Sequence, residues 1–238
     1  MRFYHLLEGM FLSRLTRFSV LAKIGNREVL AYLPNSGRLT ELLKKGNKIF
    51  LLPRTSLERK TDYDLLFVYQ GDGLVCVDAR LPNYLFSEAL NLRVLREFGD
   101  CQVIQKEVEY KGSRIDFLLS NDWLVEVKSV TLVRDGIGLF PDAPTLRGRR
   151  HLKDLMDALK EGYRTAVVFI IQREDAWGFR PNTSIDPQFS LLLRKAWERG
   201  LSIHAYGCRV RKGEIRIERR VRTYLPEWEL TSAERRPL

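Results

Sequence analysis

The chain has 238 residues, is 45% hydrophobic and carries a formal net charge of +10, with an isoelectric point near 9.6. This length suits one large domain or two small ones, and the apolar fraction is typical of a soluble globular protein. No apolar run approaches the 18 residues of a membrane span, and the N-terminal apolar patch is interrupted by Glu8, Arg14 and Arg17, unlike a signal peptide. We therefore expect a cytoplasmic protein with no membrane segment. Its basic charge favours a polyanionic partner, nucleic acid before an anionic membrane, although an ordinary basic protein would look the same.

The cysteines support the same compartment. Cys76, Cys101 and Cys208 are odd in number and far apart, and no C-x-x-C pair is present. This pattern predicts neither a disulfide framework nor a zinc site.

Residues 1–82 read as a first domain of short strands and turns. Five or so strands with one short helix predict a small OB-like β-barrel; the expected strands cover 18–24, 28–33, 48–52, 63–69 and 74–78, with the helix at 39–45. Arg54, Arg59 and Lys60 lie in one connection, close to Tyr63. They could form a phosphate-binding and base-stacking patch, or simply a solvated basic loop.

Pro82-Asn83 marks the expected boundary, and residues 83–238 form the second domain. The apolar spacing predicts a helix over 84–98, three antiparallel strands, a loop over 134–145, and then helices that alternate with strands. This order predicts an α/β domain with a mixed sheet, followed by a basic hairpin that turns at Lys212-Gly213 and a polar tail.

A hairpin over 113–130 carries the main candidate site. Apolar and polar residues alternate on both strands, so Glu126 and Lys128 share a face. Only a three-residue loop, Ser120 to Asp122, buries the apolar residues of both strands together, and this register brings Asp116 opposite Glu126.

Two facing carboxylates repel each other unless something lies between them. A divalent cation would relieve the repulsion, because hard cations prefer carboxylate oxygens. Lys128, farther along the same face, could stabilise a phosphate or a developing negative charge. The alternative is a solvated polar face on an ordinary hairpin. Glu88, early in the preceding helix, is either an auxiliary metal ligand or a favourable charge for the helix dipole.

A cluster of basic residues opens the next helix. Cations there oppose the helix dipole, so phosphate binding would explain their placement, although they could also extend into water; they are Arg147, Arg149, Arg150 and Lys153. His151 is ambiguous between a core, a capping and a catalytic role.

Asp116 with Glu126-Val127-Lys128, in this order of elements, resembles the PD-(D/E)XK nuclease superfamily. The runs LPNSGRL (33–39), SRIDFLL (113–119), VEVKSVTL (125–132) and FPDAPTLRGRRHLKDL (140–155) resemble the sugar fermentation stimulation protein (SfsA) family over nearly the whole chain. The resemblance implies an OB-like domain, a nuclease-like domain and DNA binding. It also implies Asp116, Glu126 and Lys128 as the metal and catalytic set, with Glu88 as an acidic partner. Ile115 occupies the place of the superfamily's proline.

Two functions follow as hypotheses. One is a Mg²⁺- or Mn²⁺-dependent phosphodiesterase acting on DNA, in which Asp116 and Glu126 hold the ion and Lys128 assists the attacking water. The other is a non-catalytic DNA-binding regulator of sugar metabolism that uses the nuclease-like fold as a platform. The expected nucleic-acid contacts are the basic residues already named together with Arg38 and Arg114, which lie within the family motifs. A carbohydrate-binding or scaffold role fits the charge less well, and the oligomeric state stays open between monomer and homodimer.

Overall fold

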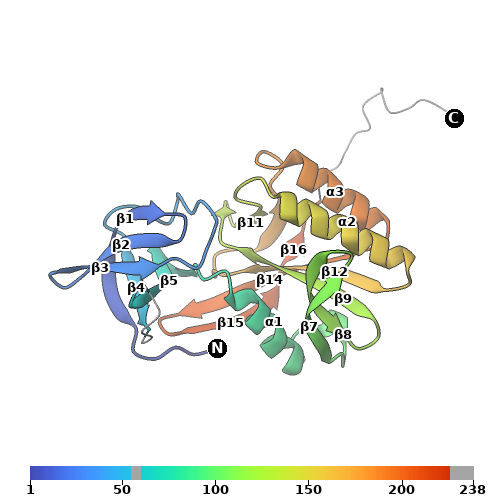
Figure 1. Ribbon diagram of the computed structural model, residues 1–238, viewed down its shortest axis with the longest axis horizontal. Helices are drawn as coiled ribbons and strands as arrows, with labels where there is room; N and C mark the ends of the chain where they lie inside the picture. Colours follow the sequence, from blue (N-terminus) through green and yellow to red (C-terminus); the bar gives the residue numbers. More distant parts are fainter. Residues whose placement is uncertain (55–59, 226–238) are drawn as a thin grey trace.

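The first domain is a closed β-barrel in the computed structural model, which describes residues 1–54 and 60–225 (Figure 1). Its sheet has the order β3-β2-β1-β4-β5-β6 and closes where β3 pairs with β5. The strands are β1 (Leu7–Thr16), β2 (Ser19–Ile24), β3 (Arg27–Tyr32), β4 (Lys48–Pro53), β5 (Tyr63–Gln70) and β6 (Gly73–Cys76). The predicted OB-like barrel is therefore confirmed.

The helix predicted over 39–45 is wrong, because the structure has turns there. Leu39 has a positive φ of 51°, which is outside the helical region, and Leu42 and Leu43 donate back to its carbonyl. The side chains of Leu39 and Leu42 are buried in the barrel core. Their helix-like spacing therefore comes from two leucines that attach a turn to the core, and not from a helix.

The second domain is built on a six-stranded mixed sheet of order β15-β14-β12-β9-β8-β7. Strand β12 runs parallel to β9 and β14, and the other neighbours are antiparallel. The strands are β7 (Val103–Tyr110), β8 (Ser113–Leu119), β9 (Trp123–Val130), β12 (Arg164–Ile171), β14 (Ser202–Arg211) and β15 (Glu214–Arg220). A smaller sheet, β10-β11-β13-β16, joins Val133–Arg134, Ile137–Phe140, Gly178–Pro181 and Arg222–Thr223. The predicted mixed α/β domain is confirmed.

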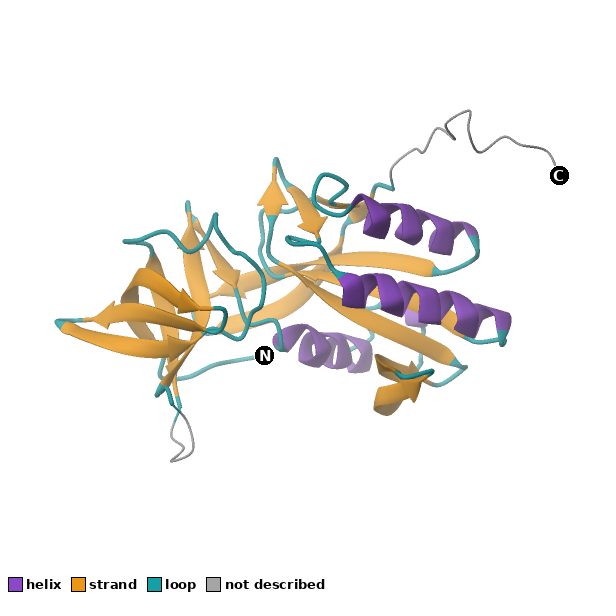
Figure 2. Ribbon diagram, turned by 45° about the horizontal axis from the view of Figure 1, so that its top comes forward, coloured by secondary structure: helices purple, strands orange, loops and turns teal. Residues whose placement is uncertain are grey.

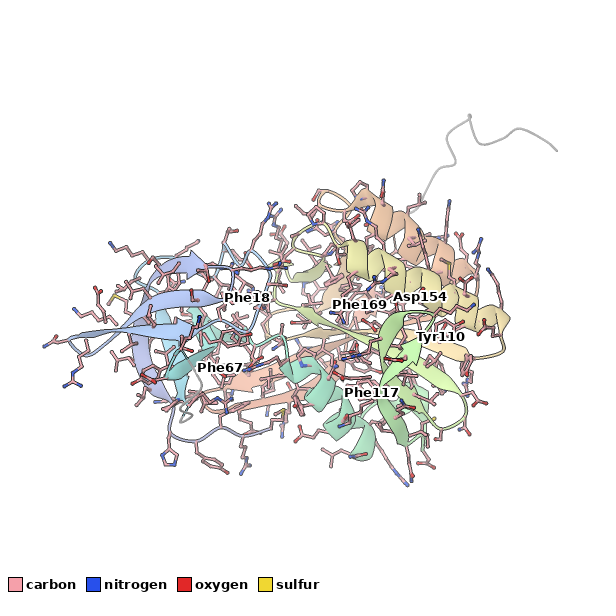
Figure 3. The ribbon with its side chains drawn as sticks, viewed as in Figure 1. Phe18, Phe67, Tyr110, Phe117, Asp154 and Phe169 are labelled. Carbon is pink, nitrogen blue, oxygen red and sulfur yellow. The ribbon has the colours of Figure 1, made fainter. Side chains whose placement is uncertain are left out.

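Three helices cover the two faces of the large sheet (Figure 2). Helix α1 (Leu81–Asn91) packs on one face with Phe117, and α2 (Leu146–Lys160) and α3 (Pro187–Glu198) pack on the other face with Phe169 (Figure 3). The sheet therefore lies between two apolar cores. Among the described residues, no helix combines the length and apolarity needed to span a membrane.

Two element boundaries differ from prediction. The helix expected over 84–98 starts earlier and ends at Asn91, because proline is accepted in a first helical turn and Arg93 adopts a positive φ; a short 3₁₀ turn, Arg96–Phe98, follows. Part of the loop expected over 134–145 is strand β11, which pairs in parallel with β13. This pairing joins segments about forty residues apart, so local sequence carries no signal for it.

The two domains share a continuous apolar core. Phe50 and Phe67 of the barrel belong to the same buried cluster as Tyr206 and Val210 of β14. Polar contacts cross the same boundary, since Gln172 donates to the carbonyl of Asp78 and accepts from the hydroxyl of Ser129. The barrel is therefore held against the C-terminal end of β9, next to Lys128.

His204 on β14 makes stability depend on pH. Its ring is 8% exposed and packs edge-on against Phe98, and its Nδ1 has no hydrogen-bond partner. Burial lowers the pKa of His204 to about 4; the Glu97 carboxylate opposes this shift and Arg220 adds to it. Between about pH 6.5 and pH 4, His204 is therefore protonated in the unfolded chain and neutral in the folded protein.

We expect this histidine to lower the free energy of unfolding by about 3 kcal/mol as the pH falls from neutral to 4, with full stability above pH 6.5. Urea denaturation of the wild-type protein and His204→Phe at both pH values measures it, because Phe keeps the aromatic contact without titrating. The prediction is wrong if both proteins lose equal stability.

Candidate functional site

The β8–β9 hairpin has the predicted register. Leu119 pairs with Trp123, and Phe117 pairs with Val125, across a three-residue loop. Asn121 and Asp122 in that loop have φ values of 59° and 57°, a conformation that these residue types tolerate. Beyond Phe117 the pairing of β8 with β9 ends, and the Asp116 side chain accepts the backbone N–H of Val127 instead.

Asp116 is held from two directions. Its Oδ2 accepts the backbone N–H of Val127 at 2.8 Å, and its Oδ1 accepts the side-chain amide of Asn83 on α1 at 2.8 Å. Burial, followed by repulsion from Glu126, raises the pKa of Asp116 to about 6, although Lys128 opposes the shift. The two carboxylates are thus close enough to affect each other, as the register predicted.

Glu126 is buried on β9 with its two oxygens in different surroundings. Oε1 contacts both the Lys128 ammonium and the His151 ring, whereas Oε2 is buried without a hydrogen-bond partner. Burial alone would raise the pKa of Glu126, but Lys128 and then His151 hold it below its usual value. Glu126 is therefore an ionised carboxylate with one free oxygen.

His151 connects Glu126 to the start of α2. Arg147 Nε donates to His151 Nε2 at 3.3 Å, which leaves Nδ1 as the protonated nitrogen that faces Glu126. The Lys128 Nζ lies 3.4 Å from the same Nδ1. The His151 ring thus fixes the orientation of the Glu126 carboxylate, as a supporting hydrogen bond does in metal sites.

These residues fit a divalent cation in part. The donors are hard carboxylate oxygens, and an unpartnered buried oxygen costs free energy that a cation would recover. Within the described residues, no group of three His, Cys, Asp or Glu side chains is placed to hold a metal. A cation at Asp116 and Glu126 would therefore complete its coordination with other oxygens.

The assignment of Glu88 to this set is wrong. Its carboxylate binds the N-terminal ammonium of Met1 through both oxygens, at 3.1 and 3.0 Å. Asn83, about one turn earlier on α1, makes the contact with Asp116 instead. The partner that α1 provides to the Asp116 carboxylate is a hydrogen-bond donor, the Asn83 amide, and not a second acidic residue.

The basic residues that open α2 have separate roles. Arg147 is exposed and contacts His151, whereas Arg150 and Lys153 are exposed and form no ion pair within the described residues. Arg149 instead pairs with buried Asp186 at 2.7 Å, and Asp186 caps the N-terminus of α3. Arg149 therefore joins α2 to α3, and its guanidinium is committed to that contact.

The remaining basic residues predicted to bind nucleic acid are scattered. Arg54 pairs with buried Asp64 at 3.1 Å, and Arg114 pairs with Glu107 at 3.3 Å. Lys60 and Arg38 are exposed. Arg59 lies outside the described residues.

Two of the family-like motifs meet at the domain boundary. The Arg38 backbone N–H donates to Asp142 Oδ2 at 2.9 Å. The Arg14 guanidinium donates to carbonyls of the same loop, including those of Gly37 and Arg38. A Cβ at position 37 would lie 2.2 Å from the Asp142 carboxylate, which explains the glycine. A cavity of about 150 Å³ lies here and reaches Ser129, the residue after Lys128.

Sequence reasoning missed or left ambiguous three residues: Asn83 and His151, which contact the site, and Asp154 on α2. Asp154 follows His151 by three residues on α2, and its Oδ2 is also buried without a partner. The only sequence signal was the spacing of His151 and Asp154 on one helix face. Asn83 carries no signal, because its partner lies 33 residues away.

Comparison with known proteins agrees with this architecture. The family model described as the sugar fermentation stimulation protein RE domain matches residues 80–214, and the SfsA N-terminal OB domain matches residues 12–77. Sugar fermentation stimulation protein homologs from Caldanaerobacter subterraneus subsp. tengcongensis and Moorella thermoacetica are 41% and 46% identical to this chain. These alignments cover 92% and 87% of this chain, and 97% and 91% of the relatives.

The solved structure of Pyrococcus furiosus SfsA in complex with Ca²⁺ matches with a TM-score of 0.89 and 31% identity. The match covers 94% of this chain and 98% of that one. The protein therefore belongs to the sugar fermentation stimulation protein (SfsA) family.

Proposed function

We propose that this protein is a Mg²⁺- or Mn²⁺-dependent phosphodiesterase that acts on nucleic acid, DNA in the first place, in the cytoplasm. The observation that carries the proposal is the Glu126 carboxylate, which is ionised, buried and left with one unpartnered oxygen beside Asp116. Such a group is costly to a fold that does not use it.

The side chains around this oxygen divide the work. Asp116 and Glu126 would hold the cation, which when bound polarises the phosphate and lowers the pKa of a water molecule. Asn83 orients Asp116, and His151 orients Glu126. Lys128 would stabilise negative charge that develops on the phosphate. Arg147 and Arg150, exposed near the start of α2, would bind the flanking backbone.

The relatives support the proposal at a coarser level. Pyrococcus furiosus SfsA, 31% identical, was solved with Ca²⁺, a cation that prefers the same oxygen ligands. The N-terminal OB domain is of a fold class that often binds single-stranded nucleic acid.

A cleavage assay tests the proposal. The purified protein is incubated with single- and double-stranded DNA and RNA in Mg²⁺, Mn²⁺ or a chelator. We expect cleavage that the chelator abolishes, and a loss of at least about a hundredfold in kcat for Lys128→Ala with partial retention in Lys128→Arg. Metal-dependent cleavage at an undiminished rate in Lys128→Ala would contradict the assigned role.

A second candidate is a nucleic-acid-binding protein without catalysis. It is favoured by the contacts of Glu126 Oε1, since the Lys128 ammonium already compensates the charge of this carboxylate without a cation and the His151 ring contacts the same oxygen. Binding that is insensitive to the chelator, together with no cleavage under any condition, would support this candidate instead.

A further inference from the structure

We propose that a groove beside β16, remote from Asp116 and Glu126 in the sequence, binds a single-stranded segment of the nucleic-acid substrate. The β16 groove is defined by four arginines and two aromatic residues: Arg180, Arg194, Arg220, Arg222, Trp197 and Tyr224. The inference deepens the proposed function, because it names the form of the ligand and the surface that holds it.

The groove consists of two adjoining cavities that share Leu225. Their volumes are about 680 Å³ and about 360 Å³, within the range of sites that bind compact ligands. Strand β16 lies at the edge of the smaller sheet and, among the described strands, pairs with β13 alone. Helix α3 and the start of β14 form the other wall.

The charge lining the groove is of one sign. Among residues 1–54 and 60–225, no carboxylate lines either cavity. Arg220 pairs with Glu97 and Arg194 with Glu198, but neither Arg180 nor Arg222 forms an ion pair in those ranges. Two exposed guanidinium groups are thus available to phosphates, which arginine binds in a bidentate manner.

Aromatic rings alternate with these charges. Trp197 is 47% exposed with Arg194 stacked 4.9 Å from its ring, and Tyr224 is 37% exposed with Arg222 at 5.6 Å. Exposed aromatic rings beside arginines are typical of surfaces that bind single-stranded nucleic acid. Unpaired bases stack on the rings, and the arginines neutralise the phosphate backbone. A duplex hides its bases, so this combination favours a single strand.

Hydrogen bonds connect one end of the groove to the segment that precedes α2. Asn182, which lines the groove, donates to the carbonyls of Phe140 and Pro141 at 2.7 and 3.0 Å. Four residues after Pro141 lies Thr145, the N-cap of α2, whose N–H donates to Asp186 of the groove-side loop. A strand at the candidate site could therefore pass Arg147 and Arg150 and continue into the groove.

Binding is tested with a fluorescein-labelled oligo-dT of about 20 nucleotides, by anisotropy in a chelator, over about 50 to 200 mM salt. The double variant Arg180→Ala/Arg222→Ala is expected to bind about tenfold more weakly at the lower salt, with a salt slope smaller by about 1.4, which is about 0.7 for each lost phosphate contact. Trp197→Leu is expected to weaken binding about tenfold with an unchanged slope, because stacking releases no counterions.

The matched control is Lys106→Ala/Lys160→Ala. It removes the same charge from β7 and from the end of α2, and we expect its affinity and slope to equal those of the wild-type protein. The groove proposal would be overturned by an unchanged salt slope in Arg180→Ala/Arg222→Ala. An equal loss of affinity in the lysine control would also overturn it. Binding to phosphatidylserine vesicles but not to the oligonucleotide would also overturn it.

The two proposals fail separately. A wild-type protein that binds the oligonucleotide through the groove but never cleaves would refute the catalytic proposal and leave the groove standing. A protein that cleaves with metal, while Arg180→Ala/Arg222→Ala binds normally, would refute the groove alone. Absence of any binding by the wild-type protein in the chelator would refute the groove proposal, whereas the cleavage assay with metal alone decides the catalytic proposal.

Discussion

Asp116→Asn is expected to weaken divalent-metal binding at least about a hundredfold, because loss of a mere outer-shell partner already costs about 10- to 100-fold. The substitution removes the negative charge and keeps the size of the side chain, so Val127 N–H retains an acceptor. We expect the free energy of unfolding of the metal-free protein to stay unchanged or to rise, since repulsion between Asp116 and Glu126 disappears. Calorimetric titration with Ca²⁺ and Mn²⁺, together with urea denaturation, measures both effects.

The same hairpin supplies a matched control. Asp122→Asn makes the same chemical change at an exposed turn position with a φ of 57°, which asparagine accepts. It should leave metal affinity and stability as they are. Metal binding in Asp116→Asn equal to that of the control would show that the cation, if any, binds elsewhere. A large loss of stability in Asp116→Asn would show that this carboxylate serves the fold.

Arg80→Ala is expected to lower the free energy of unfolding by about 3–5 kcal/mol. The Arg80 guanidinium binds Asp78 at 2.6 Å and Asp64 at 2.8 Å, and these carboxylates are 1% and 0% exposed. Both carboxylates raise the pKa of Arg80. Without the guanidinium, the buried charge of Asp78 has no ion pair among the described residues. Chemical denaturation at neutral pH gives the value.

Arg93→Ala is the control for this loss. Arg93 and Asp100 form an ion pair whose side chains are 75% and 79% exposed, so water replaces the contact and we expect a change below about 1 kcal/mol. Adding Asp78→Asn to Arg80→Ala should recover part of the stability, because it removes the orphaned charge. A loss below about 1 kcal/mol in Arg80→Ala, or no recovery in the double variant, would contradict the burial argument.

Some of the site was predictable because it depends on neighbours in the chain. Alternation along β9 alone places Glu126 and Lys128 on one face, and burying the apolar residues of both strands allows only one hairpin register. The resemblance of the motifs to a known family identified the barrel and the mixed sheet. Net charge predicted a polyanionic ligand without locating its binding surface.

Other features needed the packed layers. Glu88 and Asn83 share a helix, and only the docking of α1 on the sheet decided that Asn83 contacts Asp116 while Glu88 binds the N-terminus. The three arginines and one lysine near the start of α2 look alike in sequence, but one of them, Arg149, pairs with buried Asp186 from a segment 37 residues later. Periodicity and local charge depend on residues only a few positions apart. The sequence alone therefore predicts which face of a strand or helix a side chain occupies. Partners brought from distant segments are chosen by burial and close packing, which exist only once the sheet, the helices and the barrel have come together.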